Sequence, residues 1–428
     1  MSLYQLAQEG AVDDITTHLS ESDSDEVRAR AAEMLGDAAT AEDDDAVTAL
    51  IAAVKDDPDQ DVRGAAVDAL DALGQSTLER LIADLAGVDP ENAADWAAAN
   101  EYRQFLSADR AELRLAAATV LGRLGGDRVA ESLLDLTDDP DSRVRARVAR
   151  ACGRIGARAA TPTLADVLGN DDDARVRREA AEAIAAIGDD RALDTLVDAM
   201  DDPNPDVRRS AVMAIGEFGN PSAIEHVVHL IDDGDEAVRQ ATAFALIDLL
   251  SNAPAERSHA VREAIVDELG GIDQPAGVLE PLVDILESGS RARHRRNVAW
   301  LLGRIAEEDP PRDVIDALAD TLHSSEETTA RFAATSLVEI GGETVETTLV
   351  ETLTDDTADE SVRAKAAFAL GKVGGDHARE RLEEVIERTD SETIRERAFA
   401  ALSKIGTDTD PLDASGSATP GQSSAGGE

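Results

Sequence analysis

The sequence predicts an all-α fold, a right-handed α-solenoid built from about eleven helical hairpins. Three observations predict it. A short motif recurs about every 31 to 33 residues, apolar residues within the motif have helical spacing, and aromatic residues make up only 2% of the chain. Much of the 43% hydrophobic content is alanine. That composition favours closely packed helices over a β-sandwich, which needs β-branched and aromatic residues.

Each repeat contains a short motif such as Val176–Arg177, and we call the position of this arginine the anchor. VRREAAEAIAAIG at 176–188 is one copy, and VRRSAVMAIGEFG at 207–219 is another. Apolar residues lie one position before the anchor and three, seven and ten after it, which places them on one stripe of a helix. Ten of the eleven anchors are arginine: Arg28, Arg63, Arg114, Arg145, Arg177, Arg208, Arg239, Arg295, Ala330, Arg363 and Arg395.

A second apolar-periodic segment precedes each anchored helix, so each repeat is predicted to contain helix A and then helix B. Asp-rich turns such as DDPNPD at 201–206 join the two. In DDPDQDV at 56–62, aspartates are predicted to cap helix B rather than bind calcium, because Val62 occupies the position of the calcium-loop glycine. Glycines eleven residues after the anchor are predicted to end helix B in the left-handed conformation: Gly156, Gly188, Gly219, Gly374 and Gly406.

The predicted solenoid covers residues 1–406 as one domain. Two anchor spacings are longer than the rest, which predicts an extra segment near 87–107 and a longer unit near 251–290. The first contains Trp96, Tyr102 and Phe105, and an additional packed helix is the expected structure there. Residues 407–428 are rich in Ser, Gly and Pro and are predicted to be disordered.

The charge of the chain is extreme, because 41 basic and 89 acidic residues give a net charge of −48. Only four residues are lysine: Lys55, Lys365, Lys372 and Lys404. The acidic residues are spread along the whole chain, which indicates adaptation to molar salt rather than a basic ligand. At molar salt the screening length is about 3 Å, so partners must be held by shape, apolar contacts and close ion pairs. With neither a secretory signal nor a bilayer-spanning apolar run, we expect a cytoplasmic protein with no membrane insertion.

The recurring pattern resembles the HEAT-like repeats of the phycobilin-lyase type over residues 3 to 406, and the acidity points to a halophilic archaeon. The resemblance implies an armadillo-like helical solenoid. Similar proteins include bilin-lyase subunits, scaffolds, signalling adaptors and an iron hydroxylase, so the fold does not fix the function.

The iron hydroxylase, deoxyhypusine hydroxylase, places His–Glu pairs directly after the anchor, and a di-iron site needs several such ligands. None of the eleven equivalent positions here is histidine, and Arg178 precedes Glu179 in the repeat quoted above. We therefore expect no catalytic, metal or cofactor site. His226 and His229 are interpreted as a solvated helix face, and Cys152 as a small buried hydrophobe.

The face of helix B opposite the core is the predicted binding groove, at positions two, five and nine after each anchor. Aromatic and cationic residues there are typical of interface anchors. An alternative is that the aromatics pack between neighbouring B helices while the cations pair with acids, as Arg147 and Arg150 could with Glu179 and Glu182, which are expected to be exposed. The candidate groove residues are Phe244, Trp300, Arg304, Phe332, Lys365, Phe368, Lys372, Arg397 and Lys404, and Arg147, Arg150 and Arg154 form a secondary basic ridge.

These observations predict a non-enzymatic scaffold or adaptor that binds a protein partner along the groove. Similar repeat proteins in halophiles imply partners among signalling, motility or taxis components. The alternative is a lyase-type enzyme subunit or chaperone-like factor. RARHRR at 291–296 is the sharpest basic island. Nucleic acid is nevertheless not the expected partner, because phosphate binding needs many cations and weakens steeply with salt.

Overall fold

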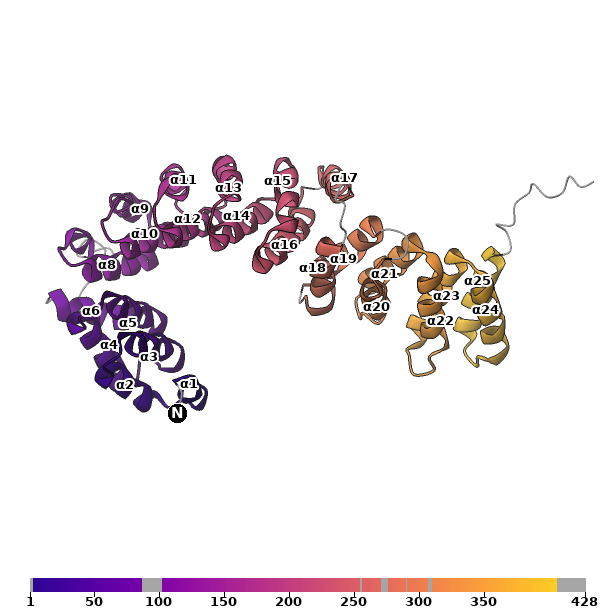
Figure 1. Ribbon diagram of the computed structural model, residues 1–428, viewed down its shortest axis with the longest axis horizontal. Helices are drawn as coiled ribbons and strands as arrows, with labels where there is room; N and C mark the ends of the chain where they lie inside the picture. Colours follow the sequence, from indigo (N-terminus) through magenta and orange to yellow (C-terminus); the bar gives the residue numbers. More distant parts are fainter. Residues whose placement is uncertain are drawn as a thin grey trace, which may run out of the picture. The chain divides into compact units, whose positions relative to one another are not determined.

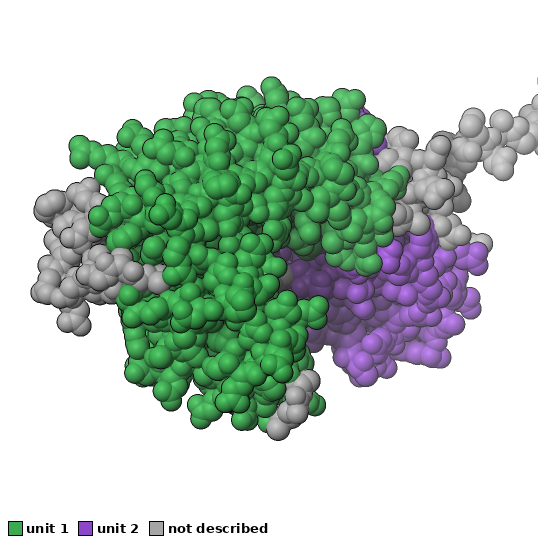
Figure 2. All heavy atoms as spheres, turned by 60° about the vertical axis from the view of Figure 1, so that its left-hand side comes forward, with its two compact units in different colours: residues 1–261 green, residues 262–428 purple. Residues whose placement is uncertain are grey.

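The computed structural model describes residues 3–86, 102–254, 256–270, 276–289, 291–306 and 310–405. All regular elements in these ranges are helices, which confirms the predicted all-α class. The chain forms two compact units, residues 1–261 (unit 1) and residues 262–428 (unit 2), coloured separately in Figure 2. A single solenoid over 1–406 stays a prediction, and each unit is described by itself.

Unit 1 holds the first seven of the eleven predicted B helices. Its elements are α1 (Leu3–Glu9), α2 (Val12–Glu21), α3 (Asp25–Ala38), α4 (Asp44–Asp56), α5 (Gln60–Leu73), α6 (Gln75–Ala86), η2 (Phe105–Ser107), α8 (Ala111–Leu124), α9 (Asp127–Leu134), α10 (Ser142–Ile155), η3 (Arg158–Ala160), α11 (Thr161–Asn170), α12 (Ala174–Ile187), η4 (Asp190–Ala192), α13 (Leu193–Ala199), α14 (Pro205–Phe218), η5 (Pro221–Ala223), α15 (Ile224–His229), η6 (Leu230–Asp232) and α16 (Glu236–Asn252).

Unit 2 holds the last four B helices, which are α19, α21, α23 and α25. Helix α17 (Ser258–Leu269) crosses the boundary between the units. The other elements are α18 (Ala276–Ser288), α19 (Ala292–Ile305), α20 (Arg312–Thr321), α21 (Glu327–Ile340), α22 (Gly342–Thr354), α23 (Glu360–Val373), α24 (Asp376–Arg388) and α25 (Glu392–Ile405).

Within each unit, every B helix except the last packs against the next B helix, and α10, α12 and α14, for example, also pack against their own A helices α9, α11 and α13. In unit 1 the B helices α10, α12, α14 and α16 form one row, and α9, α11, α13 and α15 form a second row beside it (Figure 1). In unit 2 the B helices α19, α21, α23 and α25 pack in the same order. The predicted core stripe is confirmed in α12, where Val176, Ala180 and Ile184 are fully buried. Stacked pairs therefore bury stripes that a single hairpin would expose.

The ends of the B helices follow the sequence closely. Each anchor is the fourth residue of its B helix in all eleven cases. Asp59, as predicted, caps α5 by accepting hydrogen bonds from the Asp61 and Val62 backbone N–H groups. Gly156, Gly188 and Gly219 have the predicted left-handed conformation, Gly374 has a φ of 79°, and Gly406 lies outside the described residues.

Neighbouring B helices approach most closely at a glycine eight residues after the anchor. A Cβ atom added to Gly153 of α10 would lie 2.7 Å from the Cα atom of Ala183 in α12. A Cβ atom on Gly303 of α19 would lie 2.6 Å from the Cα atom of Ser336 in α21. The missing side chain is therefore what lets the helix backbones come together.

Several predicted features lie outside the described residues. Trp96, most of the extra segment near 87–107, and the tail 407–428 are among them. Of the rest of that segment, Tyr102 is buried and Phe105 begins the short helix η2. The longer unit near 251–290 contains α17 and α18.

Candidate functional site

The anchor arginines of unit 1 link successive repeats. The Arg177 guanidinium donates from Nε and Nη2 to the Asp202 carboxylate at 2.7 and 2.8 Å, and Asp202 belongs to the A–B turn of the next repeat. Its Nη1 donates to the Asp171 carbonyl in its own turn at 2.8 Å. The Asp171 carboxylate in turn accepts hydrogen bonds from Nε and Nη2 of Arg145 at 2.7 and 2.9 Å. One arginine therefore bonds two turns, and one aspartate bonds two arginines.

These bonds form a continuous Arg–Asp chain, which we call the ladder. Burial tends to raise the pKa of Asp202, but hydrogen bonds from Arg177 and the Asn204 backbone N–H, together with the charges of Arg177 and Arg208, outweigh it, and the pKa lies below its usual value. The hydrogen bond from Arg208 likewise lowers the pKa of Asp233. In chain order the ladder consists of Arg114, Asp139, Arg145, Asp171, Arg177, Asp202, Arg208, Asp233 and Arg239.

A shorter stretch of the same kind begins the array. Arg28 bonds the carboxylate of Asp57 at 2.7 and 2.9 Å, and Arg63 bonds the carbonyl of Asp57 at 2.9 Å. Arg63 then bonds Glu112 at 2.7 Å, because Ala108 occupies the turn position where an aspartate would stand. The sequence prediction did not include these links. An aspartate six residues before an anchor is the signal that identifies them.

Unit 2 lacks that aspartate. Its equivalent turn positions are Gly289, Ser324, Thr357 and Thr389, and its third-last anchor is Ala330. Arg395 donates to the Thr389 carbonyl, as in unit 1. The Ser324 and Thr389 hydroxyls still accept a backbone N–H two residues later, as the aspartates do. The turns therefore keep their local geometry but lose the carboxylate that would link them to the preceding repeat.

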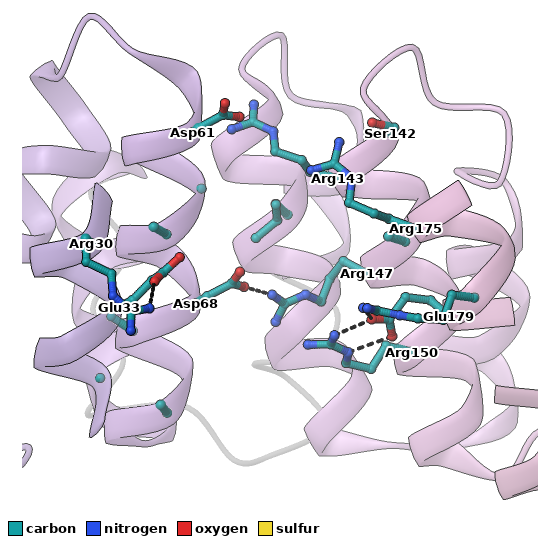
Figure 3. A pocket seen from close by; sticks show the side chains of 18 of the residues that line it. Arg30, Glu33, Asp61, Asp68, Ser142, Arg143, Arg147, Arg150, Arg175 and Glu179 are labelled. Atoms are coloured by element: carbon teal, nitrogen blue, oxygen red, sulfur yellow. Dashed lines mark hydrogen bonds and ion pairs between the residues drawn. The ribbon is translucent and has the colours of Figure 1, made fainter. Parts of the chain in front are cut away.

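A cleft of about 560 Å³ lies in unit 1 between α3 and α5 on one side and α10 and α12 on the other. Its two walls carry opposite charge (Figure 3). The first wall is mainly acidic, and its charged residues are Glu33, Asp37, Asp61, Asp68 and Arg30. The second is mainly basic, and its charged residues are Arg143, Arg147, Arg150, Arg175, Arg178 and Glu179. Helix α8 runs between α5 and α10 in the chain but contributes only Leu115 to the lining. The cleft therefore separates an acidic wall from a basic one.

Two of the three arginines of the basic ridge form close ion pairs with carboxylates of the same unit. Arg147 is buried and pairs with Asp68 and with Asp71, the latter at 3.2 Å. Burial and the charges of Arg150 and Arg154 lower the pKa of Arg147 to about 9, so it stays charged at neutral pH. Arg150 pairs with Glu179, whereas Arg154 lies 3.9 Å from Asp71 and is exposed.

The expectation that Glu179 is exposed is wrong, because only 3% of its surface is accessible. Burial tends to raise its pKa, but hydrogen bonds from Arg150 and Arg178 keep the pKa below its usual value. Glu182 is exposed, as expected. The position two residues after the anchor is buried in six of the eleven B helices: Ala116, Arg147, Glu179, Ser210, Ala241 and Asn297.

A second depression in unit 1, of about 540 Å³, contains Phe244 of the candidate groove. Met213 of α14 and Phe244 of α16 line it and are each 37% exposed. Alanines from α12, α14 and α16 make up much of the remaining lining. This part of the B-helix face is therefore apolar.

The B-helix face of unit 2 holds the other candidate groove residues. Trp300 is half-buried, and the Arg262 guanidinium lies 5.3 Å from its ring centroid. Arg304 pairs with Glu339 at 3.2 Å, and Lys365 pairs with Glu327 at the same distance. Phe332 is half-buried. These residues fit the alternative interpretation, in which side chains of this face pack and pair with their neighbours.

Phe368 and its surroundings do not fit that alternative. Phe368 is 38% exposed, and the Nζ atoms of Lys372 and Lys404 lie 5.1 and 5.2 Å from its ring centroid. Within the described part of the chain, no carboxylate lies within ion-pairing distance of Lys372 or of the exposed Arg397. We call Phe368, Lys372, Arg397 and Lys404 the Phe368 patch.

Phe399 of α25 is a feature that the sequence prediction missed. It stands four residues after its anchor, a position that is Ala or Val in the ten other B helices and is at least 97% buried in each of them. Phe399 is 62% exposed, because no later B helix packs on α25 in the described chain. Its size relative to the other ten residues was the available signal.

The other features considered in the sequence are metal ligands, the single cysteine and the basic run 291–296. No group of three His, Cys, Asp or Glu side chains in the described residues is placed to hold a metal ion. Cys152 is fully buried, and burial raises the pKa of its thiol to about 12. Within the basic run 291–296, His294 is buried and Arg295 bonds the Gly289 carbonyl. None of the described helices combines the length and the apolarity that crossing a membrane requires.

The model of the HEAT repeat family matches residues 12–103, 99–185, 165–247, 245–338, 279–360 and 348–414. The chain belongs to the HEAT repeat family. A HEAT repeat-containing taxis protein from Halobacterium salinarum is 48% identical over 391 residues, which are 91% of this chain and 95% of the relative. The resemblance found in the sequence is thereby confirmed at the level of HEAT repeats and of a haloarchaeal relative.

Solved HEAT-like structures resemble the chain more distantly. An engineered protein is 21% identical with a TM-score of 0.43, covering 92% of this chain and 99% of its own. Human deoxyhypusine hydroxylase is 21% identical with a TM-score of 0.28, covering 73% and 98%. The CpcE–CpcF complex of phycocyanin lyase from Nostoc is 19% identical with a TM-score of 0.35, covering 74% and 98%.

Proposed function

We propose that this HEAT repeat protein is a non-enzymatic scaffold of a taxis system, which binds a protein partner through its B-helix face. One observation carries the proposal. In a chain with a net charge of −48, this face exposes Phe368 beside Lys372, which pairs with none of the acidic side chains that the structure describes. Exposed aromatic and cationic side chains of this kind are typical anchors of protein interfaces. The taxis assignment is supported by the haloarchaeal relative.

Complementation tests the proposal. A Halobacterium salinarum strain that lacks its own relative should recover taxis on semi-solid agar when it expresses this chain. The double variant Phe368→Ala/Lys372→Glu should fail, because it removes the exposed ring and reverses one unpaired charge. Lys55→Glu is the matched control, since Lys55 lies in unit 1 and pairs with Asp84 at 2.7 Å. It should restore taxis as the unmodified chain does.

The fold of each variant is checked by thermal unfolding in molar KCl, where the double variant should match the unmodified protein. Failure of the unmodified chain to restore taxis would contradict the proposed role. A double variant that restores taxis would show that the Phe368 patch is not needed for the proposed role. The non-enzymatic part has a separate test, because a purified scaffold should be colourless and free of bound metal after expression with a bilin source.

A further inference from the structure

We propose that the Phe368 patch docks an acidic linear segment of a partner protein, with an apolar side chain of that segment packed on the Phe368 ring. The inference rests on the proposed scaffold function and names the chemistry of the partner. It applies to a surface formed by the last two B helices, α23 and α25.

The geometry of the patch carries the first step. Lys372 lies four residues after Phe368 on α23, and Lys404 reaches the same ring from α25. Both ammonium groups lie over the aromatic ring, an arrangement that holds them in place by cation–π attraction. The ring nevertheless remains 38% exposed. The patch therefore presents an apolar surface with ordered positive charges beside it.

The charge of the rest of the chain carries the second step. Because the chain has 89 acidic residues against 41 basic ones, many carboxylates are available to pair with a cation on its surface. Lys365, one turn before Phe368, pairs with Glu327, and Arg304 pairs with Glu339. Lys372 and Arg397 have no such partner within the described residues. A negative charge that complements them would therefore come from outside the described chain.

The expected salt concentration determines what the cations and the Phe368 ring each contribute to binding. At molar salt, charges interact only at contact distance, so they select an acidic segment but attract it little from afar. Apolar contact is not screened in this way, so the Phe368 ring should supply most of the affinity. A segment with acidic residues around one apolar residue fits both parts.

The experiment selects peptides from a random display library against the full-length chain in molar KCl. The expected result is a set rich in Asp and Glu around an aromatic or aliphatic residue. Fluorescence anisotropy then measures their affinity for variants. Phe368→Ala should raise Kd at least about tenfold, as loss of an interface anchor does. Tyr4→Ala is the control, because Tyr4 is an exposed aromatic residue of α1 in unit 1 and lies outside the B helices, and it should leave Kd unchanged.

The charge is tested by Lys372→Glu, with Lys55→Glu as its control. Lys372→Glu should weaken acidic peptides about tenfold at about 0.5 M KCl and less at about 3 M, whereas the effect of Phe368→Ala should persist. Selection against Lys372→Glu should also yield fewer acidic sequences. Selected peptides that are neutral or basic, an unchanged Kd for Phe368→Ala, or the absence of any selected binder would each overturn the inference.

A chain ending at Ile405 distinguishes a partner from the protein's own tail, which carries Asp408, Asp410 and Asp413. If acidic peptides bind only this shortened chain, and a 406–428 peptide binds it through Phe368, the tail is the occupant and the inference is wrong. If complementation succeeds without acidic selectivity, this inference alone fails. If acidic selectivity is found without complementation, only the taxis role fails.

Discussion

Unit 1 and unit 2 use the same anchor for different bonding. In unit 1 an anchor such as Arg177 bonds Asp171 in its own turn and Asp202 in the next, so that charge links successive repeats. In unit 2, Arg395 bonds the carbonyl of Thr389, and Thr389 offers no carboxylate to the preceding anchor. Close packing is common to both, as Gly153 and Gly303 show. The comparison indicates that the ladder is an addition to a packing scheme that holds without it.

The difference extends to the surface. In unit 1 even the cations of the basic ridge pair with neighbouring acids. Arg147, for example, pairs with Asp68 and Asp71. In unit 2, Lys372 and Arg397 keep no acidic neighbour among the described residues. Where arginines are bonded within the fold they rigidify it, and where cations are left over they are available to a partner. The scaffold proposal therefore places binding at the end of the chain that lacks the ladder.

Acid should produce the largest effect, because it acts at once on several aspartates of unit 1 that bond anchor arginines. The pKa values of Asp57, Asp202 and Asp233 lie below the usual value of about 3.9. Their stabilisation is therefore complete above that unfolded-state value and is lost as the pH falls through the lower folded-state values. Hydrogen exchange in molar KCl, corrected for intrinsic rates, should show unit 1 losing protection before unit 2 as pH falls below about 4.

Among the carboxylates of unit 2 whose pKa is lowered, Asp355 and Glu360 are exposed. Water screens such groups, so their protonation should change stability little. Earlier opening of unit 2 in acid would contradict the stabilising role of the ladder.

Removing one ladder arginine should come next in size. Arg177→Met keeps the packing of the side-chain stem but leaves the buried carboxylate of Asp202 and the carbonyl of Asp171 without their donor. The expected loss is about 2 to 4 kcal/mol in the free energy of unfolding of unit 1. Arg395→Met is the matched control in unit 2 and should cost less than about 1 kcal/mol, since Arg395 is exposed. Equal losses in urea unfolding would show that the carboxylate adds nothing.

The sequence alone predicts the parts of this fold that repeat locally. The anchor marks the fourth residue of every B helix, and Gly156 and Gly188 end two of them as expected. Spacing along one helix determines these features. The ladder was predictable in principle, because an aspartate six residues before an anchor recurs at a fixed spacing, but recognising it requires knowing which repeat faces which.

The candidate site was less predictable. A helical wheel places Glu179 on the face opposite the core, yet a neighbouring B helix covers that position and buries Glu179. Pairing of Arg147 with Asp68 joins residues 79 positions apart, on the B helices α10 and α5, which are not consecutive in the chain. The clustering of Phe368, Lys372 and Lys404, by contrast, follows from equivalent positions on adjacent B helices, and the sequence placed all three on one face.

Gly303→Ala tests close packing, which both units share, in the unit without a ladder. The new Cβ atom would lie within 2.4 to 2.6 Å of three Ser336 atoms, two of them the Cα and Cβ atoms that cannot rotate away. We expect unit 2 to lose about 1 to 3 kcal/mol. Gly169→Ala on α11 is the control, because nothing lies within 4 Å of its added Cβ atom, and it should be neutral or slightly stabilising. A neutral Gly303→Ala in thermal unfolding would show that the repeats of unit 2 separate freely.

Thr389→Asp should have the smallest effect and the sharpest meaning, because it places an aspartate six residues before an anchor in unit 2. The preceding anchor, Arg363, now bonds the Leu353 carbonyl and the 91% exposed Asp356, so it can turn to the new carboxylate at little cost. We expect unit 2 to gain about 0.5 to 1 kcal/mol. Thr357→Asp is the matched control, since its preceding anchor is Ala330, which supplies no guanidinium. A gain for Thr389→Asp alone would show that an Arg–Asp pair at these two positions suffices to form a ladder link. Equal gains for both variants would instead reduce the aspartate to a turn residue, whose value lies in capping helix B rather than in joining repeats.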